Sequence, residues 1–287
     1  MDLPFKVRAM LPADFGSADH IRFLIGWNQT LDDWERLFEL APDEGCFVAE
    51  LNSEVAGTVT TIAYPNEVGW IGMLLVHPAY QRRGIGMHLL VRAIDRLHQA
   101  GVSVIGLDAT PAGQNLYRKA GFNEIWKLAR WESTGSGSRD QAVDRFEYTI
   151  EPSDWPAIIR LDEQAVGMSR LALLSSLARR SDCVLQKDAP GRVRGFAMLR
   201  KGANAYQLGP MAADDDLVAV SLLNQLWSAY GDLPWYWDIP QSNSQAIALA
   251  QAHGFTLQRP LSRMVLGSQQ AMRDVESLYA IADLATG

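Results

Sequence analysis

Phosphate binding is the first chemistry that the sequence offers. Residues 81–86 read Gln-Arg-Arg-Gly-Ile-Gly, between an apolar run that predicts a strand and a helical pattern that begins at Gly86. The first N–H groups of a helix have no partner within it, and the helix dipole adds positive charge there. Gly84 and Gly86 let the backbone approach a ligand, and Arg82 and Arg83 add cationic charge. The segment predicts a turn that binds an anionic group; an ordinary glycine turn before a helix is the alternative.

Two better-known phosphate motifs are excluded by residue type. A Walker loop requires Gly-Lys-Ser/Thr, which this turn lacks. A dinucleotide fingerprint requires a third glycine where Leu89 stands. If the turn binds phosphate, it must do so as another class of site.

The turn and a second segment together resemble the GNAT acetyltransferase superfamily. One mark of that superfamily is Gln/Arg-x-x-Gly-x-Gly/Ala after an apolar strand. Residues 107–122, Leu-Asp-Ala-Thr-Pro-Ala-Gly-Gln-Asn-Leu-Tyr-Arg-Lys-Ala-Gly-Phe, resemble its second cofactor segment. The resemblance covers residues 5–131 in element order and implies an N-acetyltransferase that takes acetyl-CoA as co-substrate and needs no metal. Many members have Asn where Thr110 stands here, which leaves one cofactor hydrogen bond of the family open.

The resemblance also implies where acetyl-CoA binds. The backbone of residues 74–76 should pair with the amide-rich pantetheine arm, which can dock like an added strand. The amides of residues 82–87 should hold the pyrophosphate, with Asn115 nearby and the Tyr117 hydroxyl directed at the sulfur. The expected cofactor-binding residues are Leu74, Leu75, Val76, Gln81, Arg82, Arg83, Gly84, Ile85, Gly86, Met87, Asn115 and Tyr117.

The implied reaction is direct attack of a primary amine on the thioester. A phenol within reach of the sulfur can protonate the leaving thiolate, so Tyr117 is the expected general acid; packing under the helix is the alternative. The backbone amide at the end of residues 74–76 can polarise the thioester carbonyl. Asp108, at the end of its predicted strand, is the expected base, although a turn cap explains it equally well. His77 and Glu124 are weaker candidates, and water can also carry the proton away.

Candidate substrate-binding residues lie in a loop and on a central strand. Trp27 and Asn28, between the first two predicted helices, combine an apolar wall with a polar handle, although a Trp here can also be core. Thr60, Thr61 and Trp70, on the central strands, are weaker candidates. The amine itself stays open: an amino acid, a polyamine, an aminoglycoside-like or peptide antibiotic, or a protein amine.

The elements that must position these residues follow a definite order. Periodicity predicts a strand, two helices, three strands, a helix, a strand, a short helix and a strand. Their expected ranges are 5–10, 12–25, 31–40, 46–51, 55–64, 68–76, 86–99, 102–107, 115–120 and 122–131.

The same order returns after a Ser- and Gly-rich stretch at residues 132–140. The second set of expected elements is 146–150, 155–164, 171–179, 183–186, 193–199, 206–211, 217–230, 235–239, 244–252 and 255–266. The last helix of each set is closed by Gly-Phe, at residues 121–122 and 254–255. The pattern predicts an internal repeat of about 130 residues.

The repeat sets the expected fold class and domains. The class is α/β with a mixed sheet (α+β), a tandem GNAT-like acyl-CoA N-acyltransferase fold of two repeats. Residues 1–135 should form the acetyl-CoA-binding domain, 136–143 a linker, and 144–287 a degenerate GNAT-like domain with a C-terminal helix at about 272–284.

The second repeat is expected to lack its own cofactor site. Its equivalent turn carries Asp214, Asp215 and Asp216, which would satisfy the helix dipole and repel a pyrophosphate. An equivalent of Tyr117 is not evident either, so one chain should bind one acetyl-CoA. The second half should cover the first domain and contribute to the substrate pocket. Asp238, beside an aromatic run, is a candidate ligand for a cationic amine or else part of a buried strand.

Composition bounds the remaining possibilities. The chain has 287 residues, of which 48% are hydrophobic and 21% charged, as in a globular protein. Its net charge of −7 disfavours nucleic-acid binding. Neither a signal peptide nor an uninterrupted apolar run of about 18 residues is present, so no membrane partner and a cytoplasmic location are expected. Cys46 and Cys183 stand far apart in apolar contexts, which favours buried, reduced thiols.

Partners and rival functions complete the expectations. The partner should be a small-molecule or peptide amine, and the protein a monomer or homodimer. One rival is a non-catalytic acyl-CoA-binding or sensor protein. The other is a transferase that uses a longer acyl-CoA.

Overall fold

The computed structural model describes residues 4–41, 43–135, 150–268 and 276–287, which fall into two compact units. Unit 1 comprises Met1–Glu124, Met264–Gln269 and Leu284–Gly287; unit 2 comprises Ile125–Arg263 and Gln270–Asp283. The units therefore do not follow one cut in the sequence, because each takes residues from the other half. The predicted linker at 136–143 lies outside the described residues.

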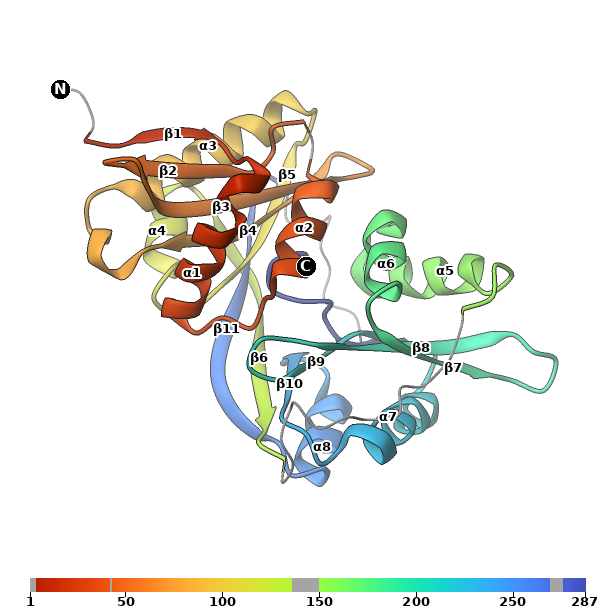
Figure 1. The fold of residues 1–287 in the computed structure, drawn as a ribbon. Coiled ribbons are helices and arrows are strands. Elements are labelled where there is room, and N and C mark those ends of the chain that lie inside the picture. Colours follow the sequence, from red (N-terminus) through yellow and green to blue (C-terminus); the bar gives the residue numbers. More distant parts are fainter. Residues whose placement is uncertain (1–3, 42, 136–149, 269–275) are drawn as a thin grey trace. The chain divides into compact units, whose positions relative to one another are not determined.

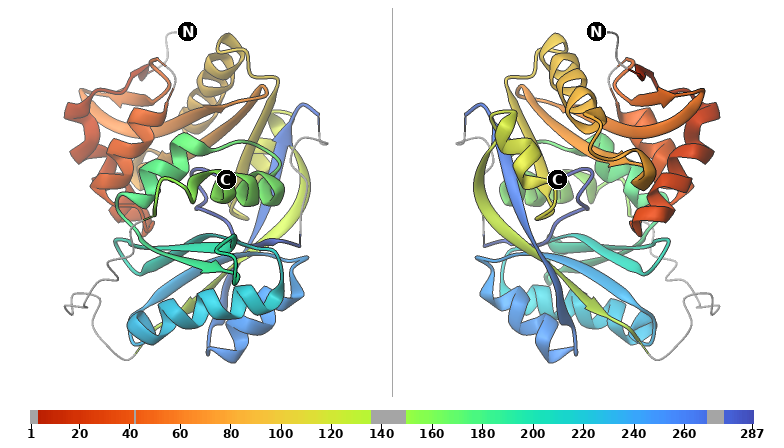
Figure 2. Two further views of the ribbon diagram at one scale, coloured as in Figure 1. Left: turned by 90° about the vertical axis from the view of Figure 1, so that its right-hand side faces the viewer. Right: turned by 90° about the vertical axis from the view of Figure 1, so that its left-hand side faces the viewer.

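Unit 1 is a sheet with two helices on each face (Figures 1 and 2). Its strands, in spatial order, are β1 (Lys6–Ala9), β2 (Phe47–Leu51), β3 (Glu54–Tyr64), β4 (Val68–Val76) and β5 (Val104–Ala109), followed by β11 (Thr256–Leu266), which belongs to this unit through its last residues. The β4–β5 pair is parallel, and the preceding pairs are antiparallel. The helices are α1 (Phe15–Ile25) and α2 (Leu31–Leu40) on one face, and α3 (Ile85–Gln99) and α4 (Gln114–Lys119) on the other.

The helix that follows β4 shows why the sequence folds as it does. Leu89, Leu90, Ala93 and Leu97 recur at helical spacing on α3, and all are buried in the core against the sheet. Gly84 is the N-cap of this helix, and its left-handed φ of 84° turns the chain sharply out of the preceding loop. Burial of this stripe fixes the N-terminus of α3 at the end of β4.

Unit 2 repeats the same layers. Its strands, in spatial order, are β11, β6 (Asn123–Ser133), β10 (Trp235–Pro240), β9 (Tyr206–Ala213), β8 (Val193–Lys201) and β7 (Asp182–Lys187), and β12 (Leu278–Ala280) pairs with β9. One face carries α5 (Trp155–Val166) and α6 (Leu171–Ala178), and the other carries α7 (Asp216–Tyr230) and α8 (Ser244–Ala252) (Figure 1). The predicted α/β class with a mixed sheet in two repeats is confirmed.

One predicted element is wrong. The structure has a strand, β12, where the sequence favoured a helix at residues 272–284, and Leu284–Gly287 form no helix. Side chains hold the backbone carbonyls that a helix would use: Asn243 donates to Leu278 O (3.1 Å) and Trp237 Nε1 to Tyr279 O (2.8 Å). A predicted strand at residues 146–150 falls almost wholly outside the described residues.

Two further sequence-based expectations can be checked here: one concerns the two cysteines, and the other concerns membrane-spanning helices. Cys46 and Cys183 are buried free cysteines, and burial raises the pKa of each thiol to about 12. Both thiols therefore stay protonated at neutral pH. Within the described ranges, no helix has the length and apolar character needed to cross a membrane.

Candidate active site

A bulge in β4 opens the sheet of unit 1. Thr58 pairs with Leu75 but Thr60 pairs with Gly72, so the two residues 73–74 lie opposite the single residue Val59. Met73 adopts a left-handed φ of 47° there. An extra residue of this kind bends its strand and increases its twist.

The bend separates β4 from its parallel neighbour. The β4–β5 register runs only from Val68–Trp70 to Val104–Gly106. Beyond that point Leu74–Val76 and Asp108 both face a cavity of about 480 Å³. The cavity is lined by Ile25, Trp27, Leu74, Leu75, Val76, Gln81, Arg82, Gly84, Ile85, Gly86, Met87, Asp108, Thr110, Ala112, Gly113, Leu116 and Tyr117. An open strand edge, a helix N-terminus and the side chains of Asp108 and Tyr117 thus meet in one space.

The glycine turn forms the polar end of this cavity. Arg82 and Gly84 both have left-handed backbone conformations, with φ of 63° and 84°. Gln81 Nε2 donates to Val76 O (3.3 Å), which ties the turn to the end of β4. The amides that begin α3 therefore sit beside the open strand edge, as an anion site at a helix N-terminus requires.

Two expected cofactor residues do not line the cavity. The Arg83 guanidinium stacks over the Tyr80 ring at 5.6 Å and donates to Ala79 O (3.5 Å). Asn115 is exposed on α4. The other ten residues of the expected cofactor set are all in the lining.

Tyr117 is half-buried on α4, and its side chain lines the cavity. Burial raises its pKa, so the phenol keeps its proton throughout the physiological range. Gly113 is packed against the ring: a Cβ there would lie 2.9 Å from Tyr117 Cε2. Its φ of −85° suits any residue, so the glycine is needed for space rather than for backbone conformation. Sequence reasoning missed Gly113, although it stands in the motif just before α4.

Asp108 lies at the end of β5, is 8% exposed and lines the same cavity as Tyr117. The two weaker base candidates are outside that lining. His77 accepts from the Ala79 N–H (3.2 Å) and caps a short 3-10 helix at Pro78–Tyr80. Glu124 is exposed at the start of β6. Asp108 is thus the one of the three candidates that faces the cavity.

The expected substrate residues separate in the structure. Trp27 is half-buried and lines the cavity with Ile25. Asn28 is 1% exposed and is not part of that lining. Thr60 and Thr61 are also buried away from it, and Thr61 donates to Gly45 O (2.7 Å).

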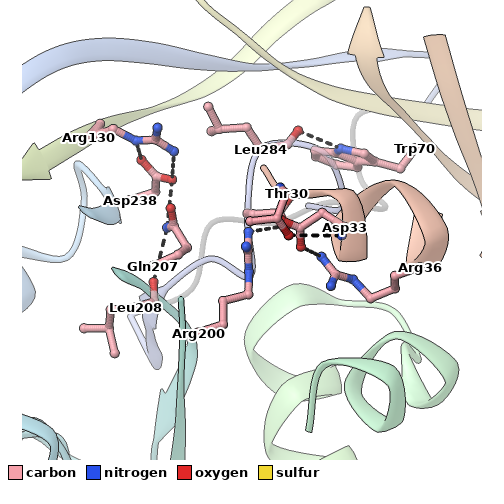
Figure 3. Close-up of polar contacts among 11 residues, drawn as sticks. Thr30, Asp33, Arg36, Trp70, Arg130, Arg200, Gln207, Leu208, Asp238 and Leu284 are labelled. Atoms are coloured by element: carbon pink, nitrogen blue, oxygen red, sulfur yellow. Dashed lines mark hydrogen bonds and ion pairs between the residues drawn. The ribbon is translucent and has the colours of Figure 1, made fainter. Parts of the chain in front are cut away.

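Trp70 has a packing role instead of the expected substrate role. Its side chain is 0% exposed, and Nε1 donates to Leu284 O (3.2 Å), as Figure 3 shows. Gly287 lies against the indole, and a Cβ on Gly72 would lie 2.4 Å from Ala285 O. Residues 284–287 therefore cover this part of β4, and Trp70 cannot reach a ligand.

Asp238 is likewise a structural residue, contrary to the amine-binding interpretation. It is 0% exposed and accepts from Arg130 Nε (2.8 Å) and Nη2 (2.7 Å) and from Gln207 Nε2 (3.2 Å), as drawn in Figure 3. Arg130 is also buried and stacks over the Tyr236 ring at 4.8 Å. Every partner of this carboxylate lies in unit 2, where the bidentate pair joins β6 to β10.

We expect Asp238→Asn to lower the free energy of unfolding by about 3–5 kcal/mol, because one member of a buried ion pair is left without compensation. Urea unfolding followed by circular dichroism measures the change. Asp214→Asn is the matched control, since Asp214 pairs with Arg194 at the surface (2.6 Å) and should cost less than about 1 kcal/mol. A larger effect on the KM of the amine than on stability would restore the substrate-binding interpretation of Asp238.

Comparisons with known proteins identify the family of this chain. Residues 13–122 match the model of the acetyltransferase (GNAT) family, and residues 158–280 match that of an acetyltransferase (GNAT) domain. The chain therefore belongs to the GNAT superfamily as a tandem member.

Similar sequences and structures are known from several organisms. Holothin acyltransferase from a Pseudoalteromonas species is 27% identical over 68% of this chain and 65% of its own length. The ribosomal protein bS18 alanine N-acetyltransferase of Escherichia coli K12 is 34% identical over 24% of this chain and 49% of its own. The chain thus spans less than two thirds of the length of these curated relatives.

Solved structures match over most or all of the chain. A presumed acetyltransferase from Pyrococcus horikoshii superimposes with a TM-score of 0.82 at 26% identity, over 100% of this chain and 97% of its own. A tandem GNAT protein from the clavulanic acid biosynthesis pathway has a TM-score of 0.64 at 13% identity, over 91% and 98%. The second likeness is one of fold alone.

Proposed function

We propose that unit 1 is an acetyl-CoA-dependent N-acetyltransferase acting on a primary amine. One observation carries the proposal: a single cavity contains the open edge of β4, the glycine turn at the start of α3, and the Tyr117 side chain. An extended, amide-rich arm, a pyrophosphate and a thioester sulfur would each find a suitable partner there.

Acetyl-CoA fits the donor set of this cavity. The amides of Ile85–Met87 and the Arg82 side chain would hold the pyrophosphate, and the backbone of Leu74–Val76 would pair with the pantetheine arm. A backbone N–H at the end of β4 would polarise the thioester carbonyl. The GNAT family generally uses this co-substrate, which supports the assignment.

The proposed reaction is direct transfer. The neutral amine attacks the carbonyl carbon, a C–N bond forms, and the C–S bond then breaks. Tyr117 donates a hydrogen bond and its proton to the leaving sulfur. Because burial raises the pKa of Tyr117, its phenolate is a strong base and recovers a proton from the attacking nitrogen. The products are an amide and free CoA thiol, with one proton released from the original ammonium.

Asp108 is the proposed base that neutralises the incoming ammonium, directly or through water. We expect Asp108→Asn to lower kcat/KM about 10²-fold at neutral pH, with a smaller deficit at high pH, where the amine loses its proton unaided. Kinetics from pH 6 to 10 with one amine measure this. An equal loss at every pH would assign Asp108 to turn capping instead. Glu124→Gln, at the exposed base candidate outside the cavity lining, is the control and should leave the profile unchanged.

The acceptor is a small-molecule or peptide amine. By their names, the curated relatives act on holothin and on an alanine of a ribosomal protein, so both kinds of acceptor occur among similar proteins. Trp27 and Ile25 would form the apolar wall for the acceptor. We further propose a cytoplasmic monomer or homodimer without a nucleic-acid partner.

A panel of primary amines, assayed for thiol release from acetyl-CoA, tests the proposal. Release that depends on one amine class supports an N-acetyltransferase and names the acceptor. Tight acetyl-CoA binding with no release for any amine would support the acyl-CoA sensor. Competition among acyl-CoAs of increasing length tests the longer-acyl alternative.

A further inference from the structure

Unit 2 contains the same strand bulge as unit 1. Ala197 pairs with Met211 but Leu199 pairs with Leu208, so the two residues 209–210 lie opposite the single residue Met198. The bulge in β4 has the same arrangement, with two residues opposite one. Residues 211–212 therefore correspond to the open strand edge that lines the cavity of unit 1.

In unit 2 that edge is occupied by the chain itself. β12 pairs antiparallel with β9, with Leu278 opposite Ala212 and Ala280 opposite Met211. On its other side, the Ile281 N–H donates to Asp238 O of β10 (3.2 Å). The β9–β10 register covers only residues 206–208 and 235–237, so β12 fills the space where these parallel strands diverge.

Side chains of unit 2 are placed to hold this strand. Asn243 Nδ2 donates to Glu276 O (2.9 Å) and Leu278 O (3.1 Å), and Trp237 Nε1 donates to Tyr279 O (2.8 Å). The Tyr279 hydroxyl donates to Asp216. These hydrogen bonds hold the backbone of β12 and one of its aromatic side chains.

The strand that receives β12 is also shaped for it. Gly209, in the bulge, has a φ of 139°, and a Cβ there would lie 1.9 Å from Ile281 O. No other residue type leaves room for that carbonyl. The close approach of backbone to backbone requires glycine at this position.

The equivalent of Tyr117 is absent from unit 2 because alanine takes its place. The Phe255 N–H donates to Ala250 O (2.9 Å), as the Phe122 N–H donates to Tyr117 O (3.1 Å). The closing turns of α8 and α4 thus superimpose Ala250 on Tyr117. Ala250 is fully buried in the core of this unit.

The three aspartates also serve the fold of unit 2. Asp215 caps α7 by accepting from the Val218 N–H (3.0 Å). Asp214 and Asp215 pair with Arg194 (2.6 and 3.2 Å), and Asp216 accepts from Tyr279. The turn that would repel a pyrophosphate therefore helps to hold β12.

We infer that the groove between β9 and β10 is a binding site for an extended polypeptide strand, filled in cis by residues 278–281. This strand takes the place that the acyl-CoA arm takes in unit 1, and in that respect the inference rests on the proposed function. The whole chain then binds one acetyl-CoA, and neutralising the aspartates does not create a second site.

Hydrogen exchange of the full-length protein tests how β12 is held. Asn243→Asp keeps an oxygen to cap α8, where Asn243 Oδ1 accepts from the Ala246 N–H (2.8 Å), but removes both donors to β12. We expect at least tenfold faster exchange of the amides of residues 278–281. Asn224→Asp, the same change at a residue that contacts His253 instead, should leave them unchanged. Fast exchange in the wild-type protein, or no change in Asn243→Asp, would overturn the inference.

A peptide added in trans tests the groove itself. Leu278→Asp places a charge at a position that is 1% exposed and should displace β12. The peptide Glu-Ser-Leu-Tyr-Ala-Ile-Ala-Asp, residues 276–283, should then bind this variant in fluorescence anisotropy, while the wild-type protein should not bind it. A scrambled peptide is the control. If a folded Leu278→Asp variant fails to bind the peptide, the groove is not a strand site. If the variant does not fold, the exchange experiment decides.

Calorimetry with acetyl-CoA separates this inference from the proposed function. Failure of the wild-type protein to bind any acetyl-CoA would refute the function of unit 1, while the exchange and peptide data would still judge β12. Two acetyl-CoA molecules per wild-type chain would overturn the β12 inference and leave unit 1 intact. We expect one, and still one in Asp214→Asn.

Discussion

Gly86→Glu should abolish acetyl-CoA binding in calorimetry. A Cβ at Gly86 meets Leu116 Cδ2 at 3.5 Å and Val76 Cγ2 at 3.6 Å, which are ordinary contacts, so the fold should tolerate the side chain. The helix dipole also stabilises a carboxylate near the start of a helix, so the new charge should not unfold the protein. The loss therefore comes from charge: two like charges ~4 Å apart at an effective dielectric of ~20 cost about 4 kcal/mol, or roughly a thousandfold in Kd.

The control for this variant is Gly16→Glu. Gly16 lies on α1 with no atom within 4 Å of a built Cβ, and it does not line the cavity. The Gly16→Glu substitution adds the same charge to the same unit and should leave the Kd for acetyl-CoA within about twofold of the wild-type value. Unchanged binding in a folded Gly86→Glu protein would remove the glycine turn from the cofactor site.

Tyr117→Phe should lower kcat about 10²-fold or more while the Kd for acetyl-CoA changes little. The substitution keeps the ring, which packs against Phe122 and Gly113, and removes only the hydroxyl. Pre-steady-state measurement with a slow amine isolates the chemical step. Since burial raises the pKa of Tyr117 above its ordinary value, the wild-type kcat should show no fall from Tyr ionisation as the pH rises to about 10.

Tyr80→Phe gives the matched control. Tyr80 is at the surface and donates to Glu54 (2.7 Å), outside the cavity lining. Loss of the Tyr80 hydroxyl should leave kcat unchanged. A wild-type rate in Tyr117→Phe, with chemistry shown to limit turnover, would assign Tyr117 to packing alone.

The parts of this site that local sequence encodes could be predicted. The glycine turn, the start of α3 and the placement of Tyr117 on α4 each depend on residues close together in the chain, and all of them reach the cavity. The order of the described elements up to β11 followed from hydrophobic periodicity for the same reason. Asp108 and Trp27 were inferred from their positions at the ends of elements, where loops meet the cavity.

The rest depends on contacts between residues far apart in sequence. Asp238 beside aromatic residues suggested an amine site, but Arg130, more than a hundred positions earlier, neutralises it. Residues 278–285 are apolar at most positions, a pattern that suits a helix or a fully buried strand equally. The carbonyl partners Asn243 and Trp237 decide in favour of a strand, and no local signal reveals them.

The composition of unit 1 has a consequence for the order in which the protein matures on the ribosome. Met264 belongs to its hydrophobic core, and residues 284–287 cover Trp70 and accept the Tyr64 hydroxyl hydrogen bond (2.7 Å) at Thr286 O. Most of the proposed catalytic unit precedes the second repeat in the chain, yet the unit cannot close until residues 264–266 and 284–287, which follow most of that repeat, have been made. Until then the phenol of Tyr64 on β3 and the indole of Trp70 on β4 lack this cover, so a nascent chain halted after the first repeat would bind chaperones rather than act as an early enzyme.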